Sequence, residues 1–362
     1  MSTITIDSNT PVAVGMSGGV DSSAAAFLLQ QYSSRLMGVS HYIWPEGDCC
    51  SAELLARARD ACAHLEIPYL VEDLQEEFTR AVVQDFVDAY LDGKTPNPCV
   101  RCNQRIRFST FYRRLESKLR STGFLEQGET LKMATGHYVR VEETDEGLFL
   151  RRGLDKRKDQ SYMLYQIPKE LLSNFIFPLG EMKKTEVVAL AKEHGLPAAA
   201  ARESQDACFV HGRYGDFIAD FTGSRKGNEP GEIVDTAGTV LGTHRGYINY
   251  TIGQRQGLGL GSGPWFVVGV DPRSNRIVVG RREELGTREF GISGCNWFFR
   301  KTPASFEGKV KIRYNSPGIP CRVRIDRECR ARVTLSRQEA VTPGQSAVFY
   351  REDLVLGGGI ID

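Results

Sequence analysis

The sequence predicts an α/β protein: a Rossmann-like domain with a parallel sheet, a small central domain and a C-terminal β-barrel. Three observations support this prediction. Strand-like runs alternate with helical runs from residue 12 to about residue 205, which is the βαβ rhythm of a parallel sheet. Short β-prone runs separated by turns follow Cys208. Finally, 362 residues exceed what one hydrophobic core usually serves, so we expect two or three domains.

The first domain, residues 1–215, begins with strands and helices in alternation. We expect strands at 12–16, 36–43, 67–71 and 132–135, and helices at 21–32, 52–65 and 181–195. Ligands of such sheets bind at the carboxyl ends of the strands. The sequence therefore predicts a ligand site formed by the loops at 15–23, 41–50 and 135–138.

The remaining chain is β-rich and divides into a central domain at 216–287 and a terminal domain at 288–362. Central strands are expected at 231–235, 240–242, 247–252, 266–270 and 276–279, and terminal ones at 309–314, 322–325 and 331–335. Regular spacing of short strands favours a small barrel or a sandwich. Of the two, we expect a barrel at the C-terminus.

Composition narrows the class of protein. The formal net charge of +1 gives no general attraction to nucleic acid, so any such site must be a local basic patch. Residues 1–11 lack the features of a signal or transit peptide, and no apolar run approaches the ~20 residues that span a membrane. We therefore expect a cytoplasmic protein without a membrane partner. In that compartment, nine cysteines argue against a disulfide framework.

The glycine-rich loop after the first strand is the most informative stretch for function. Gly18 and Gly19 let the backbone approach an anion, and hydroxyls at Ser17, Ser22 and Ser23 add donors. The helix that follows has a partial positive charge at its N-terminus, which binds phosphate without a lysine. The lysine of a Walker loop is absent, so this is not a G-x-x-x-x-G-K-S/T switch. The loop predicts phosphate binding; an ordinary glycine-rich turn is the alternative.

A second segment, residues 93–103, indicates sulfur chemistry. Pro96 and Pro98 are expected to hold it extended or turned, so that it presents Cys99 and Cys102 rigidly. Positive neighbours favour the nucleophilic thiolate of Cys102, namely Arg101, Arg105 and Arg107. Half of a structural zinc site is the alternative. Such a site needs a second pair of ligands at close spacing, and the sequence offers none.

Six motifs in order resemble those of one family. They are Gly-Met-Ser-Gly-Gly-Val-Asp-Ser at 15–22, Thr-Pro-Asn-Pro-x-x-x-Cys-Asn at 95–103, Ala-Thr-Gly-His-Tyr at 134–138, Lys-Asp-Gln-Ser-Tyr at 158–162, Ser-Gln-Asp-x-Cys-Phe at 204–209 and Tyr-Thr-Ile-Gly-Gln-Arg-x-Gly-Leu-Gly at 250–259. The chain resembles the tRNA-specific 2-thiouridylases, which belong to the PP-loop ATP pyrophosphatases. These enzymes use ATP and a protein-bound persulfide to convert the wobble uridine of the tRNAs for Glu, Gln and Lys to 2-thiouridine.

The resemblance implies an ATP site and a pair of catalytic cysteines. ATP would adenylate the C2 oxygen of the uridine, with Mg²⁺ helping to neutralise the leaving pyrophosphate. Cys208 would carry the persulfide and Cys102 would free its sulfur, leaving a disulfide between them. Because a disulfide needs Cα atoms within about 7 Å, we expect a mobile loop at about 200–212. The residues implied to bind ATP are Gly15, Met16, Ser17, Gly18, Gly19, Val20, Asp21, Ser22, His41 and Gly136.

The resemblance also implies tRNA contacts. Asn97, Pro98 and Cys99 would touch the target base, which must leave its stack to be reached. The basic run at 151–157 would contact phosphate. The implied partners are tRNA and a persulfide donor, such as a cysteine desulfurase or a sulfur relay protein. Further residues implied to contact tRNA are His137, Lys158, Asp159, Gln160, Arg313, Tyr314 and Gln345.

Two departures from the family pattern leave alternatives open. Cys99 stands where many members have Asp, which puts a carboxylate base at that position in doubt. His41 stands where many have Met or Leu near the adenine. Cys99, Cys102 and Cys208 could instead hold an iron–sulfur cluster for a cluster-dependent tRNA thiolase. A different PP-loop ligase, such as an amide-forming synthetase, is a further alternative, against which the paired cysteines count.

Overall fold

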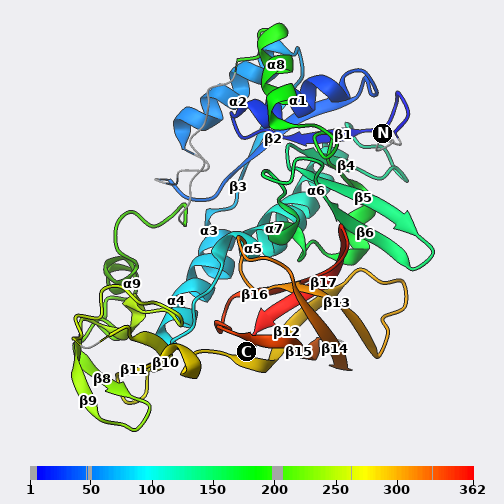
Figure 1. The fold of residues 1–362 in the computed structure, drawn as a ribbon. Helices are drawn as coiled ribbons and strands as arrows, with labels where there is room; N and C mark the ends of the chain where they lie inside the picture. Colours follow the sequence, from blue (N-terminus) through cyan, green and yellow to red (C-terminus); the bar gives the residue numbers. More distant parts are fainter. Residues whose placement is uncertain (1–5, 46, 48–50, 198–206, 262, 328) are drawn as a thin grey trace.

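The computed structural model describes residues 6–45, 47, 51–197, 207–261, 263–327 and 329–362. The chain forms a parallel sheet flanked by helices, a small separate sheet and a closed barrel (Figure 1). The predicted α/β fold class is confirmed. In the described part of the chain, no helix is both long enough and apolar enough to cross a membrane.

The first domain is built on a five-stranded sheet whose neighbouring strands are all parallel. Val12 and Val14 of its middle strand pack into one apolar cluster, and Ala13 packs into another on the opposite face. Such a strand must be apolar throughout because both of its faces are covered. In spatial order the strands are β3 (Tyr69–Asp73), β2 (Leu36–Tyr42), β1 (Val12–Gly15), β4 (Lys132–Thr135) and β7 (Phe175–Ile176).

Helices cover both faces of this sheet. The face of Val12 is packed by α1 (Val20–Leu29), α2 (Ala52–His64) and α8 (Lys184–Glu193). These three helices and the strands β1 to β4 lie where the sequence predicts them, to within three residues at each end, whereas β7 was not predicted. The face of Ala13 is packed by α3 (Gln75–Phe78), η1 (Thr79–Val83), α4 (Gln84–Leu91), α5 (Pro98–Arg101), η2 (Cys102–Phe111), α6 (Tyr112–Ser121), α7 (Ser161–Leu164) and η3 (Lys169–Asn174).

Residues 94–97 are not helical and Asn97 is extended, as the sequence predicts, but the prediction is wrong for Cys99 and Cys102, which lie in a helical segment. Asn97 is extended, with φ −112° and ψ 96°, but Pro98 is the first residue of α5. A proline fits there because its missing N–H would have no partner in the helix. The π-helix η2 follows α5 without a break, which places the two cysteines one helical turn apart.

The central domain is a four-stranded sheet with α9 (Tyr214–Thr222) beside it. The strand expected at 247–252 is wrong, because this run begins with the short 3₁₀ helix η4 (Tyr247–Asn249). Gly246, with φ +101°, turns the chain, and the buried Tyr247 donates its hydroxyl to the Leu91 carbonyl at 2.9 Å. The strands, in spatial order, are β10 (Phe266–Asp271), β11 (Arg276–Gly280), β8 (Gly231–Asp235) and β9 (Val240–His244).

The terminal domain is a barrel of six strands, closed by the pairing of β17 with β12, and not a sandwich. A hairpin of the first domain, β5 (Val139–Thr144) and β6 (Gly147–Arg152), pairs with β17 and ties the two domains together. The short η5 (Arg282–Glu284) precedes the barrel. Around the barrel the order is β12 (Thr287–Trp297), β15 (Arg330–Glu339), β14 (Ile319–Arg327), β13 (Ser305–Lys311), β16 (Ser346–Arg351) and β17 (Leu354–Ile361).

Candidate functional site

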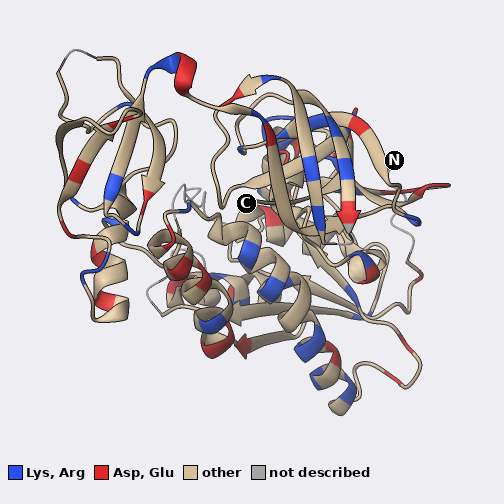
Figure 2. Cartoon of the chain, turned by 90° about the horizontal axis from the view of Figure 1, so that it is seen from below, with Lys and Arg blue, Asp and Glu red and all other residues tan. Residues whose placement is uncertain are grey.

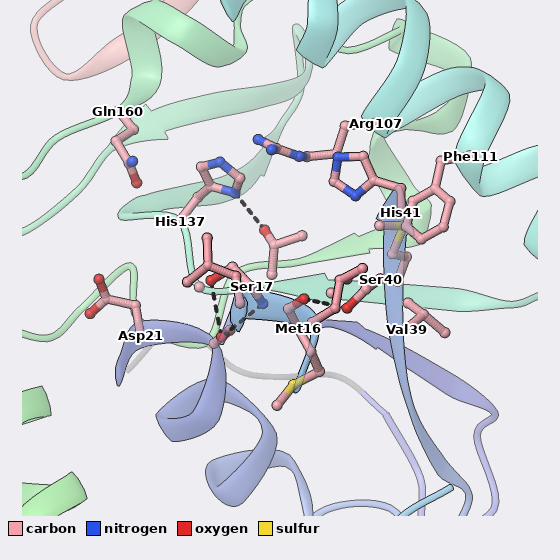
Figure 3. A pocket seen from close by; sticks show the side chains of 17 residues that line it. Met16, Ser17, Asp21, Val39, Ser40, His41, Arg107, Phe111, His137 and Gln160 are labelled. Atoms are coloured by element: carbon pink, nitrogen blue, oxygen red, sulfur yellow. Dashed lines mark hydrogen bonds between the residues drawn. The ribbon is translucent and has the colours of Figure 1, made fainter. Parts of the chain in front are cut away.

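A cavity of about 250 Å³ lies at the carboxyl ends of β1, β2 and β4, where the sequence predicts a ligand. Asp21 and Gln160 lie at one end of it, and His41 and Phe111 at the other (Figure 3). The cavity is lined by Gly15, Met16, Ser17, Asp21, Ser22, Val39, Ser40, His41, Leu54, Leu55, Arg107, Phe111, Met133, Thr135, Gly136, His137 and Gln160.

The glycine-rich loop contributes mainly backbone and hydroxyl groups to this cavity. Gly18 has φ +73°, and a Cβ atom there would lie 2.4 Å from the Leu54 carbonyl oxygen, so only glycine fits. Ser22 donates its hydroxyl to the Gly19 carbonyl at 2.9 Å and accepts the Ser17 N–H at 3.1 Å. Gly19 precedes α1 and has no side chain with which to cap it. The N–H groups at the start of α1 are therefore suited to an anion.

Two histidines in the cavity are held neutral. Burial, assisted by the positive charge of Arg107, lowers the pKa of His41 and of His137 to about 3. His137 Nδ1 lies 2.8 Å from the Thr135 hydroxyl and shares a hydrogen bond with it. The His41 and Phe111 ring centroids are 5.1 Å apart. The buried Nε2 of His41 has no hydrogen-bond partner among the described residues, which leaves it available to a ligand.

Asp21 supplies a carboxylate to the cavity, and two groups hold it. The Tyr138 hydroxyl donates to Oδ1 at 2.7 Å. Lys184, the first residue of α8, places Nζ 2.7 Å from Oδ1 and 2.6 Å from Oδ2. The Lys184 side chain is 27% exposed and that of Asp21 33%, so the pair lies at the surface end of the cavity. The negative charge of Asp21, a residue of α1, is thus balanced by a lysine of a different helix, α8.

The predicted ATP residues largely meet in this cavity. Gly18, Gly19 and Val20 do not line it and instead form the turn into α1. A Cβ atom on Gly136 would lie 2.7 Å from the Asp21 carbonyl carbon, so glycine is needed where β4 ends against α1. The other residues predicted to bind ATP all line the cavity: Gly15, Met16, Ser17, Asp21, Ser22, His41 and Gly136.

Cys99 and Cys102 lie on the helical segment that also carries Arg107. The Asn97 side chain caps α5 by accepting the Val100 N–H at 3.3 Å. The Cys99 side chain is exposed, and that of Cys102 is half-buried. Desolvation by the surrounding protein raises the pKa of the Cys99 thiol, although Arg107 acts in the opposite direction. Cys99 is therefore a neutral thiol near neutral pH.

The arginines expected to favour a Cys102 thiolate are used in different ways. Arg101 Nε and Arg105 Nη1 lie 3.3 and 2.9 Å from the Asp85 carboxylate. Arg107 lines the cavity, and its Nη1 donates to Asn103 Oδ1 at 2.9 Å. Arg101 and Arg105 thus share the single negative charge of Asp85, and the thiolate at Cys102 remains a prediction.

Cys208 is half-buried beside an aromatic cluster. The next residue, Phe209, is buried, and its ring centroid lies 6.0, 5.6 and 5.2 Å from those of Trp44, Phe78 and Phe86. These contacts fix the chain immediately after Cys208 against the helices that cover the sheet.

The surroundings of Cys208 include the loop that follows β2. A Cβ atom on Gly47 would lie 3.4 Å from the Cys208 carbonyl oxygen. No disulfide joins Cys102 to Cys208. Residues 200–206 of the predicted mobile loop, like Cys49 and Cys50, lie outside the described residues.

No group of three or more His, Cys, Asp or Glu side chains among the described residues is arranged to hold a metal ion. Cys99, Cys102 and Cys208 all belong to the described part of the chain. The arrangement therefore does not assemble the ligand set that the iron–sulfur alternative requires, and we derive no step through a cluster.

The motif at 158–162 joins the cavity to the barrel. The buried Asp159 carboxylate accepts from Arg152 Nε at 2.7 Å and from the Ser161 hydroxyl at 3.1 Å. Gln160 lines the cavity and accepts the Tyr138 N–H at 2.9 Å. Like Gln160, the predicted tRNA residue His137 faces the cavity. Asp159 thus holds the motif in place, and the tRNA contacts of Lys158, Asp159, Gln160 and His137 remain predictions.

The predicted tRNA residues of the barrel contact the other two domains, and one of them, Gln345, contacts the segment that carries Asn97, Pro98 and Cys99. Gln345 Nε2 donates to the Thr95 carbonyl at 2.8 Å. Arg313 Nη2 donates to the Ile252 carbonyl at 3.2 Å, and the Tyr314 hydroxyl donates to the Asp159 carbonyl at 3.2 Å. All three domains therefore meet beside the predicted target-base segment. Contact with tRNA remains a prediction for each of these residues.

Sequence reasoning missed several residues of the site. Lys184 lies 163 residues from Asp21, and no local pattern links the two. Arg107 entered the sequence analysis as a neighbour of Cys102, whereas it lines the cavity. Tyr138 lies inside the motif at 134–138, which was the one available signal for it. Other lining residues for which the sequence predicts no role in binding are Val39, Ser40, Leu54, Leu55, Phe111, Met133 and Thr135.

The three domains match known family profiles in order. Residues 10–212 match the tRNA methyl transferase HUP domain, residues 216–281 the tRNA methyl transferase PRC-barrel domain and residues 287–361 the aminomethyltransferase beta-barrel domain. The fold, the cavity and these matches define a HUP-domain enzyme with two β-rich domains attached.

Curated relatives identify the family. The tRNA-specific 2-thiouridylase MnmA of Acidithiobacillus ferrooxidans is 43% identical over 96% of this chain and 97% of its own. That of Geobacter metallireducens is 44% identical over 97% of this chain and 96% of its own. The chain belongs to the tRNA-specific 2-thiouridylase family. Among solved structures, the U34-tRNA thiolase NcsA from Methanococcus maripaludis is 19% identical over 60% of this chain and 67% of its own, with a TM-score of 0.34 that is too low to bear on function.

Proposed function

We propose that this protein uses ATP to convert the wobble uridine of the tRNAs for Glu, Gln and Lys to 2-thiouridine. Cys208 carries the sulfur as a persulfide, and Cys102 is its partner. The observation that carries the proposal is the cavity on the lysine-free glycine-rich loop, which Gln160 of the motif at 158–162 also lines. We further propose a cytoplasmic reaction with a protein as persulfide donor.

The cavity favours one orientation of ATP. The phosphates lie at the end of the cavity that Ser17 and Asp21 line, against the N-terminus of α1. The partial positive charge of this helix end stabilises them. The adenine lies at the end of Phe111, where the unpartnered Nε2 of His41 can hydrogen-bond to it. Mg²⁺ fits this site as an ion carried by phosphate oxygens and water, with Asp21 as the protein carboxylate. When bound, it neutralises charge on the pyrophosphate.

The reaction consists of three displacements: at the α-phosphorus of ATP, at the sulfur of Cys208 and at C2 of the flipped uridine. First, the C2 oxygen attacks the α-phosphorus of ATP, and pyrophosphate leaves with the electrons of the broken bond. The Cys102 thiolate then attacks the Cys208 sulfur of the persulfide, which forms a Cys102–Cys208 disulfide and releases hydrosulfide. The hydrosulfide attacks C2 and displaces AMP. A thiol reductant returns the disulfide to two thiols before the next cycle.

Exposed arginines on the barrel supply a local basic patch for tRNA. Arg324 of β14 lies directly opposite Arg332 of β15, and Arg330 lies on the same strand as Arg332. All three are exposed, and no ion pair joins them to a described acidic residue. Like charges directly opposite in a sheet destabilise it unless an anion lies between them. We propose that these three residues, the arginine face, contact the tRNA backbone. Figure 2 shows where basic residues lie along the strands and helices of the chain.

The test is the nucleoside content of tRNA. Deletion of the gene should remove 2-thiouridine from the wobble position, as measured by mass spectrometry of digested tRNA. The purified full chain, supplied with ATP, Mg²⁺, a cysteine desulfurase and cysteine, should then restore it to the deletion-strain tRNA, and omission of ATP should prevent this. Wobble 2-thiouridine that persists at its normal amount after deletion would overturn the proposal.

A further inference from the structure

Lys184 lies at the end of the cavity where we propose that the phosphates bind, and none of the proposed reaction steps uses its charge. Among the described residues that line the cavity, Arg107 is the only lysine or arginine, and it lies beside the two histidines (Figure 3). The opposite end holds Asp21, a carboxylate that by itself would repel the phosphates of ATP. Lys184 reaches this end from α8 and pairs with both carboxylate oxygens of Asp21.

The fold holds the Lys184 side chain at this position. Helix α8 packs on α1, and Val187 and Ala191 are buried in the apolar cluster that also contains Ala24 (Figure 1). The backbone N–H of Lys184 donates to an Asp155 carboxylate oxygen at 3.0 Å, which fixes the start of α8. Three features therefore hold the Lys184 ammonium at the glycine-rich loop: the packing of α8, the backbone hydrogen bond to Asp155 and the ion pair with Asp21.

The Lys184 ammonium keeps a donor for a ligand. An ammonium has three N–H groups, and the two hydrogen bonds to Asp21 use at most two of them. The Asp21 carboxylate is also held by the Tyr138 hydroxyl, so it stays in place if the ammonium turns toward an anion. The side chain is 27% exposed, which leaves it free to turn.

We propose that Lys184 binds the β- and γ-phosphates of ATP and the pyrophosphate that leaves. It supplies, from 163 residues away, the cation that the glycine-rich loop lacks. As the bond between the α-phosphorus and the bridging oxygen breaks, negative charge gathers on the pyrophosphate, and a fixed ammonium stabilises it. This inference rests on the proposed ATP site and extends it to a further catalytic residue.

The first test compares ligands by calorimetry, using the full chain with Mg²⁺ at constant ionic strength. Lys184→Met should weaken binding of ATP and of inorganic pyrophosphate by roughly 10–100-fold, because a charged hydrogen bond is lost, and should change adenosine binding less than about twofold. Lys184→Arg should retain most of the affinity. Lys183→Met is the matched control, since Lys183 is adjacent and exposed, and it should bind all three ligands normally. Equal weakening of ATP and adenosine binding would mean that Lys184 only supports packing and would overturn the inference.

The second test asks whether Lys184 contacts phosphate directly or only neutralises the charge of Asp21. Asp21→Asn removes the carboxylate charge that Lys184 balances. In that background, Lys184→Met should still weaken pyrophosphate binding by roughly tenfold if the ammonium touches phosphate. No effect in that background would overturn the inference while leaving the ATP site intact. If Lys184→Met lowers the melting temperature, Lys184→Gln serves in both tests. Failure of the wild-type chain to bind ATP would overturn this inference and the proposed function together.

Discussion

The nucleotide cavity and the arginine face bind phosphate, in our proposal, by opposite means. In the cavity, Asp21 is paired with Lys184, two histidines are neutral, and the loop offers backbone and hydroxyl donors. On the barrel, Arg324 and Arg332 lie opposite each other in solvent. Fixed dipoles suit a small nucleotide that is enclosed, whereas exposed charges suit a long polyanion. The net charge of +1 conceals this difference because it averages over both regions.

The largest expected effect falls on the cysteines, which belong to neither phosphate-binding region. Cys208→Ser should fail to accept a persulfide, and Cys102→Ser should accept sulfur yet form no 2-thiouridine. Both variants should bind ATP and tRNA normally, since neither residue lines the cavity or the arginine face. Persulfide labelling with mass spectrometry and a thiolation assay measure the two steps. Thiolation by Cys102→Ser at the wild-type rate would contradict the mechanism.

Cys99→Ala is the matched control for these variants, because Cys99 lies one helical turn from Cys102. Its thiol is neutral and exposed, so the variant should keep appreciable thiolation activity. The anaerobically purified wild-type protein should lack the visible absorbance of an iron–sulfur cluster. Loss of both such absorbance and activity in Cys99→Ala would instead support the cluster alternative.

The affinity for tRNA at the arginine face should depend on salt concentration much more strongly than the affinity for ATP in the cavity. With about four phosphate contacts, tRNA affinity should fall roughly 100-fold between 50 and 200 mM salt, because counterions are no longer released favourably. ATP affinity should fall less than about tenfold over the same range. The double variant Arg324→Thr/Arg332→Thr should lower the salt slope for tRNA by about two and leave ATP binding unchanged. Fluorescence anisotropy measures both affinities, and an unchanged slope would exclude the arginine face as a tRNA contact.

The neutral histidines predict a pH dependence of stability in the first domain. Their folded-state pKa of about 3 lies below the unfolded value of about 6.5, so the unfolded chain binds more protons. Their contribution is therefore present above pH 6.5 and is lost as the pH falls toward 3. At pH 5.5 the loss is about 1.4 kcal/mol for each histidine. Urea unfolding at pH 7.5 and 5.5 measures it, and His41→Phe should show a smaller loss than the wild type.

The smallest expected effect is a gain in stability on the barrel. Arg332→Thr removes one of two like charges that lie directly opposite each other, which should stabilise the domain by about 0.2–1 kcal/mol. The same variant should weaken tRNA binding. Arg337→Thr is a control, because Arg337 on the same strand is paired with Glu339 at 2.7 Å. A variant that loses both stability and tRNA affinity would indicate that Arg332 has a structural role instead.

Much of the lining of the cavity could be predicted because it is local in sequence. Gly15, Ser17 and Asp21 belong to one strand–loop–helix unit, and a parallel sheet brings His41 and Gly136 to the same edge. The spacing of arginines on the barrel strands indicates a shared face, but only the register shows that Arg324 and Arg332 are opposite.

Other features depend on tertiary contacts that no local pattern encodes. Lys184 reaches Asp21 only because α8 packs on α1. The apolar run at 247–252 resembles a strand, but its buried Tyr247 anchors the chain to α4 instead. Asp159 lies in a motif expected to contact tRNA, and only the fold shows that its carboxylate is used inside the protein.

The most direct test of the account is the fate of ATP during thiolation. The full chain is incubated with substrate tRNA, a persulfide source and ATP labelled at the α-phosphate, and the products are counted against 2-thiouridine formed. A lysine-free loop that grips the leaving pyrophosphate predicts one AMP and one pyrophosphate for each 2-thiouridine, with tRNA required for both. ADP and phosphate formed in step with 2-thiouridine would contradict the account.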